Sequence, residues 1–102
     1  MSNISIDSPI RVKGCPYCEL LANEKNVIYK PRKNINDCSF VIVMCPKEHK
    51  EVVIATEHVA SLPRGLDRLA LYHARKYKES NVSLKVDRRY VSDHWHAYIE
   101  LI

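Results

Sequence analysis

Runs of apolar residues predict a set of short strands in the first half of the chain. Residues 38–45, CSFVIVMC, are apolar and largely β-branched, and Pro46 ends the run. A bounded segment of this length and composition is typical of a buried central strand. Residues 26–30 predict a shorter strand that stops at Pro31, and residues 51–55 extend the sheet.

The second half of the chain contains one stretch with helical periodicity. Residues 61–64, Ser-Leu-Pro-Arg, predict its start, with the serine as cap and the proline in the first turn. The positions that follow recur at spacings of three or four and form a stripe facing the core: Leu66, Leu69, Ala70, His73 and Tyr77. A much shorter helical turn is predicted over residues 19–23.

Residues 94–102 alternate strictly, which predicts a strand with two different faces. Its apolar face comprises Trp95, Ala97, Ile99 and Leu101. The opposite face carries His94, His96 and Tyr98. Residues 83–90 also have strand-like stretches. Short strands, one long helix and further strands predict an α+β fold with an antiparallel sheet.

Length and composition restrict the organisation of the protein. A chain of 102 residues with two glycines and no repeat predicts a single domain over residues 1–102. Residues 1–13 are predicted to form an N-terminal arm of this domain. No apolar stretch approaches the ~20 residues that a membrane helix needs, and the polar start lacks the apolar run of a signal peptide. We therefore expect no membrane association and a cytoplasmic location.

The charge of the chain favours anionic ligands. Lys and Arg number 16 against 12 Asp and Glu, a formal net charge of +4. This excess falls short of the dense basic stripe of a dedicated nucleic-acid binder. Phosphate-bearing small molecules are therefore the favoured ligands, and nucleic acid is the less favoured one.

The sequence Cys15-Pro-Tyr-Cys18 has two readings in a protein without an export signal: a redox dithiol or half of a zinc site. The tetrapeptide looks like the glutaredoxin active site, but residues 11–14 are too short and polar for the buried strand expected before it. Zinc needs two further ligands, which His49 and either His94 or His96 can supply.

The remaining cysteines and histidines have less specific interpretations. Cys38 and Cys45 bracket the central strand and are expected to be core residues, with Cys45 in reserve as a ligand. We expect His58 to be a surface side chain and His73 a helix-face side chain, neither of them a ligand. Packing is the favoured role for Tyr17, although an aromatic ring could also stack on a base.

The order of four features along the chain resembles that of the histidine triad (HIT) superfamily. These features are the Cys15 to Cys18 knuckle, residues 41–49 (VIVMCPKEH), a helix and His94-Trp-His96. The resemblance extends to its zinc-carrying branch and to the hexose-phosphate uridylyltransferases, and it covers almost the whole chain after residue 14. It implies an antiparallel sheet of about five strands, one long helix and a zinc knuckle near the N-terminus. The implied ligands of a structural Zn²⁺ are Cys15, Cys18, His49 and His94.

The same resemblance implies a reaction. The central histidine of the family attacks the α-phosphorus of a nucleotide and forms a nucleotidyl-histidine intermediate, and the matching residue here is His96. Tyr98 occupies the third motif position, where its hydroxyl can donate one hydrogen bond to a phosphate or leaving group. A phenolic hydroxyl, with an ordinary pKa of about 10, does not replace a histidine that titrates near neutrality.

The segment before the motif also differs from the family. The usual Gly-Gln-Ser is replaced by residues 88–93, in which Ser92 is the candidate phosphate contact. Arg88 and Arg89 either add positive charge to this site or form a solvated basic edge.

Two functions follow from the resemblance. The first is a nucleotide hydrolase, acting on a phosphoramidate or a dinucleoside polyphosphate, or a nucleotidyltransferase, with His96 and Tyr98 as catalytic residues. The second is a non-catalytic zinc module of the same fold that binds a nucleotide, nucleic acid or protein, and Tyr98 favours it. The resemblance also implies a homodimer.

Overall fold

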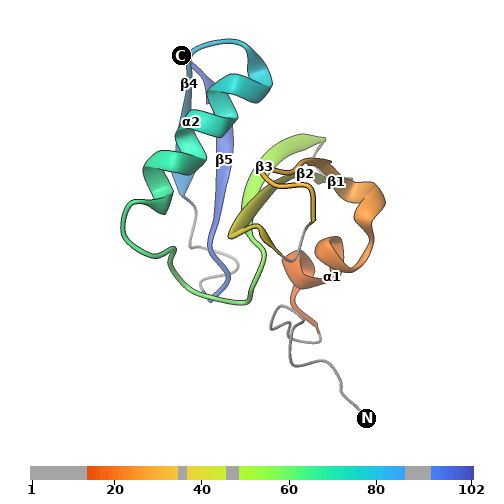
Figure 1. The fold of residues 1–102 in the computed structure, drawn as a ribbon. Helices are drawn as coiled ribbons and strands as arrows, with labels where there is room; N and C mark the ends of the chain where they lie inside the picture. Colours follow the sequence, from red (N-terminus) through yellow and green to blue (C-terminus); the bar gives the residue numbers. More distant parts are fainter. Residues whose placement is uncertain (1–13, 35–36, 46–48, 87–92) are drawn as a thin grey trace.

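The computed structural model describes residues 14–34, 37–45, 49–86 and 93–102. Its elements follow one another as α1 (Pro16–Ala22), the 3₁₀ turn η2 (Glu24–Asn26), β1 (Val27–Tyr29), β2 (Phe40–Cys45), β3 (Lys50–Ala55), α2 (Leu66–Lys78), β4 (Val82–Val86) and β5 (His96–Leu101) (Figure 1). The predicted arm at residues 1–13 and the second half of the strand predicted over residues 83–90 lie outside the described residues.

The five strands form one sheet in the order β1-β2-β3-β5-β4, and every neighbouring pair is antiparallel. This confirms the predicted α+β class and the antiparallel sheet. The last strand, β5, lies between β3 and β4, with Val53 opposite Ala97. The end of β3 therefore lies beside the start of β5. None of the helices in the described part of the chain combines the length and apolar composition that a bilayer crossing requires.

The sheet separates two apolar layers, one under each helix. The α1 layer contains Leu21 and Val52, and the α2 layer contains Val53 and Ala74. Strand β2 contributes alternate residues to both layers, which explains why its sequence is apolar throughout. Figure 1 shows α2 lying along β4 and β5, away from α1.

The alternation predicted for the last strand is confirmed. Tyr98 packs on the α1 layer, whereas Trp95, Ala97 and Ile99 pack in the α2 layer. His96 lies on the same face as Tyr98 and is 1% exposed. The polar face of β5 is therefore buried at His96 and partly buried at Tyr98.

Both helices begin elsewhere than the sequence pattern predicts. Helix α2 starts at Leu66, whose backbone N–H donates to Pro63 O, and Gly65 before it has φ +89°. Ser61 is therefore not its cap, because a left-handed glycine turns the chain into the helix. Helix α1 starts at Pro16, three positions before the predicted turn, because a fixed φ suits proline to the first helical position.

A polar cluster joins α2 to the sheet on the face opposite α1. The Tyr77 hydroxyl donates to Glu51 Oε2 at 2.7 Å, and Lys78 Nζ lies 2.6 Å from Glu51 Oε1. Burial raises the pKa of Glu51, but hydrogen bonds from Lys78 and Tyr77 and the Lys78 charge outweigh it, so the pKa is lowered. Burial, followed by the hydrogen bond to Glu51 and its charge, raises the pKa of Tyr77 to about 12.

We expect Tyr77→Phe to lower the free energy of unfolding by about 1 kcal/mol at pH 8, because Glu51 loses one hydrogen bond. The raised pKa of Tyr77 means that the folded state holds the phenolic proton more tightly than the unfolded state. The contribution of the protonated Tyr77 hydroxyl to the free energy of unfolding is complete below pH 10 and is lost as the pH rises to about 12. Urea unfolding of both proteins across this range tests the prediction, and a difference that does not change with pH would contradict it.

Candidate metal centre

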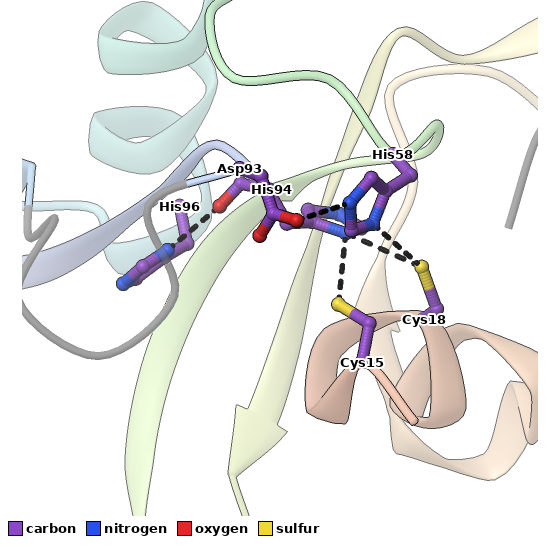
Figure 2. Close-up of polar contacts among 6 residues, drawn as sticks. All are labelled: Cys15, Cys18, His58, Asp93, His94 and His96. Carbon is purple, nitrogen blue, oxygen red and sulfur yellow. Dashed lines mark hydrogen bonds and ion pairs between the residues drawn. The ribbon is translucent and has the colours of Figure 1, made fainter. Parts of the chain in front are cut away.

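Helix α1 presents two thiols on one side. Cys15 immediately precedes the helix and Cys18 lies one turn later, so their side chains share a face. Both are buried, with 7% and 3% of their surface exposed. Figure 2 shows both sulfurs directed away from α1, toward His94 and His58.

Backbone pairing brings two histidines from distant segments to these thiols. Ala55, at the end of β3, donates its N–H to Trp95 O, and Trp95 donates its N–H to Val59 O. His58 and His94 each precede one partner of the second bond, and their rings meet edge to face at 5.2 Å. The fold thus places both imidazoles above the start of α1.

Three of the sulfur–nitrogen distances among the four donor atoms match those of a tetrahedral zinc site. Cys18 Sγ lies 3.4 Å from Nδ1 of both His58 and His94, and Cys15 Sγ lies 3.5 Å from His94 Nδ1. All four atoms lie within 4.8 Å of one another. Zn–S bonds of about 2.3 Å and Zn–N bonds of about 2.0 Å place a sulfur and a nitrogen about 3.5 Å apart at a tetrahedral angle. Two thiolates and two imidazoles therefore fit a structural zinc ion.

The outer nitrogens of the histidines support the same assignment. His94 Nε2 lies 2.8 Å from Ala55 O, and His58 Nε2 lies 2.9 Å from Asp93 Oδ2. These oxygens are acceptors, so each Nε2 carries the proton and each Nδ1 presents a lone pair to the cluster. Burial lowers the pKa of His94, and the nearby His58 and His96 lower it further against the opposing hydrogen bond to Ala55, which favours the neutral, ligating form.

The fourth member of the cluster is His58, not His49 as the family resemblance implied. His49 lies exposed in the turn before β3, with φ 55°. Six residues of extended chain, about 20 Å, separate it from Ala55, beside which the cluster lies. The expectation that His58 is a surface side chain is corrected: 12% of its side chain is exposed, and its ring contacts Cys18 and Asp93.

We expect His58→Ala to weaken zinc binding by at least 100-fold, whereas His49→Ala leaves it unchanged. Loss of a hydrogen-bond partner of a ligand typically weakens binding by about 10- to 100-fold, and loss of the ligand itself removes a metal bond. Competition with a chromophoric zinc chelator measures both affinities. An equal loss in the two variants, or a larger loss in His49→Ala, would contradict this ligand set.

The candidate nucleophile lies two residues after His94 but outside the cluster. His96 Nδ1 lies 2.9 Å from His94 O, and the imidazole points away from the sulfurs (Figure 2). The ring of Tyr17 stacks on His96 with centroids 4.4 Å apart and planes 29° apart. The sequence did not single out this contact, since it depends on how α1 packs on β5.

The other predicted site residues have different outcomes. Tyr98 lies edge-on to the His96 ring at 5.8 Å, and its hydroxyl is 3.4 Å from that of Tyr17. Lys50 Nζ lies 5.3 Å from the centre of the Tyr98 ring, which places a cation near this group. The predicted phosphate contact Ser92 lies outside the described residues.

Comparisons of the chain with protein-family models, with curated proteins and with solved structures found no match. The candidate metal centre comprises two sulfurs and two nitrogens, from the start of α1, the segment after β3 and the segment before β5.

Proposed function

We propose that the protein is a HIT-like zinc protein that hydrolyses or transfers a nucleotidyl group through His96. A zinc ion bound by the cluster would tie α1 to the two segments that flank the β3–β5 pair and hold the start of β5 in place. The reactive group is then the neighbouring imidazole of His96. The metal itself takes no part in the reaction.

One observation carries this proposal. The carbonyl of His94 accepts a hydrogen bond from His96 Nδ1, so the proton resides on Nδ1. The lone pair of the ring is therefore on Nε2, the nitrogen that projects away from the backbone. An imidazole nucleophile requires this arrangement: an unprotonated nitrogen, and a partner that orients the ring from the other side.

The proposed reaction has two displacements. His96 Nε2 forms a bond to the α-phosphorus as the bond to the leaving group breaks, and the leaving group departs with the electron pair and takes a proton from water. Water or a second alcohol or phosphate then attacks the same phosphorus, the Nε2–phosphorus bond breaks, and the attacking group loses its proton to solvent. Tyr98 lies edge-on to the His96 ring, and Lys50 Nζ lies over the Tyr98 ring; the tyrosine hydroxyl and the lysine ammonium are the proposed donors to the phosphoryl oxygens.

Trapping of the intermediate tests the proposal. The zinc-loaded protein is mixed with adenosine phosphoramidate or a dinucleoside polyphosphate, quenched at alkaline pH and measured by intact-mass spectrometry. We expect an acid-labile adduct of one nucleoside monophosphate less water, located on His96 by peptide mapping. Absence of the adduct and of turnover with every nucleotide tried would refute an enzymatic role.

A second function, a non-catalytic zinc module, is favoured by a different observation. His96 is only 1% exposed, and Tyr17 covers one face of its ring. In such a module these side chains form a packed core, and the nucleotide or protein partner binds without covalent chemistry. Thermal stabilisation of the zinc-loaded protein by a nucleotide, with no adduct and no turnover, would favour this function over the first.

A further inference from the structure

We propose that Tyr17 is a positioning residue for His96 and that the metal centre holds Tyr17 in place. Tyr17 lies between the two cysteines of the cluster, in the first turn of α1. It is 8% exposed, and its ring stacks on that of His96 at 4.4 Å. As far as His96 is the reactive group, this inference rests on the proposed function.

The stack restricts the His96 ring in a way that the backbone hydrogen bond does not. The bond from Nδ1 to His94 O holds one edge of the ring but leaves the ring free to tilt about that edge. Tyr17 covers one flat face, and Tyr98 meets the ring nearly at a right angle, with planes 89° apart. Together these contacts fix the ring plane and cover the His96 ring, which is 1% exposed.

The two tyrosines differ in how firmly they are held. Their hydroxyl oxygens are 3.4 Å apart, beyond the usual range of about 2.5–3.0 Å for such a bond, so this link is weak. Tyr17 is anchored on both sides by residues of the metal cluster, whereas Tyr98 is only partly buried. Tyr98 is therefore the more exposed neighbour of the His96 ring, and Tyr17 is the buried one.

Chemical modification measures this cover without reference to turnover. Zinc-loaded protein is treated with diethyl pyrocarbonate, and the rate at each histidine is followed by peptide mass spectrometry, with exposed His49 as the internal reference. We expect slow modification of His96 in the wild type and in Tyr17→Phe, which keeps the ring. In Tyr17→Leu, which removes the ring, we expect modification of His96 at least tenfold faster with one zinc retained.

The ring orientation supplies a second readout that loss of packing alone does not produce. Long-range ¹⁵N–¹H NMR should show the Nδ1–H form of His96 in the wild type and in Tyr17→Phe, and a mixture of both tautomers in Tyr17→Leu. If Tyr17→Leu does not retain zinc, Tyr17→Met, which keeps a long apolar side chain, takes its place.

The outcomes separate this inference from the proposed function. Equal rates of His96 modification in Tyr17→Leu and in the wild type would overturn the inference. Rapid modification of His96 in the zinc-loaded wild type would also overturn it. Equal acceleration in Tyr17→Phe and Tyr17→Leu would also overturn it, because the hydroxyl link rather than the ring would then be the cover. A missing nucleotidyl adduct overturns the proposed function alone.

Discussion

Replacing Cys18 with serine is expected to release the zinc and lower the free energy of unfolding by at least about 3 kcal/mol. The Cys18 sulfur lies beside both histidines of the cluster, so its replacement removes a donor atom from the middle of the candidate site. Structural zinc contributes about 10–16 kcal/mol of apparent binding free energy in small zinc domains. The total stability of a small domain is only about 5–15 kcal/mol, so the variant is expected to be largely or fully unfolded at 37 °C.

Elemental analysis and urea unfolding of the same samples measure this effect. Cys45→Ser is the matched control, because Cys45 is a partly buried cysteine at the end of β2 and is not in the cluster. We expect it to keep one zinc per chain and a transition close to that of the wild type. A Cys18→Ser protein with full zinc content and unchanged stability would rule out a structural metal at this position.

Replacing His96 with alanine is expected to reduce nucleotide turnover by at least about a thousandfold while the zinc content remains that of the wild type. The reason is the separation of roles within three residues of the chain. The His94 side chain faces the cluster, whereas the His96 ring points away from it and contributes no donor atom to it. Loss of activity without loss of metal is the result that distinguishes a nucleophile from a residue needed only for folding.

Tyr98→Phe provides the graded comparison. It keeps the ring beside His96 and removes a single hydroxyl donor, which is expected to reduce turnover about 10- to 100-fold, the effect of one hydrogen bond to a charged group. The zinc content of each variant is measured in parallel with its rate. Turnover of His96→Ala within tenfold of the wild type would exclude His96 as the nucleophile.

The local patterns of the sequence predicted much of the fold. The alternation over residues 94–102 assigned His96 and Tyr98 to one face of the last strand, because a strand's period of two is visible in any stretch of a few residues. The buried central strand was visible for the same reason. Helix starts were harder, since the position of α2 depends on the backbone conformation of Gly65 rather than on an apolar stripe.

The metal cluster depended on pairing that single segments do not contain. The spacing of Cys15 and Cys18 is enough to identify them as candidate ligands. Of the four ligands implied by the resemblance, these two and His94 do lie together in the structure. His58 was missed because its position depends on the antiparallel pairing of β3 with β5. A signal was nevertheless available: His58 closely follows one strand and His94 closely precedes another, and antiparallel neighbours bring such ends together.

His94 combines two tasks in different parts of the same residue. Its imidazole belongs to the cluster, and its carbonyl oxygen accepts a hydrogen bond from Nδ1 of His96, the next histidine on that face of the chain. A substitution of His94 changes the side chain and therefore its role in the cluster. It leaves the main-chain carbonyl in place, because every amino acid has one. A single substitution at residue 94 can therefore remove one donor of the candidate metal centre. The carbonyl oxygen that orients His96 is displaced only if the main chain itself moves.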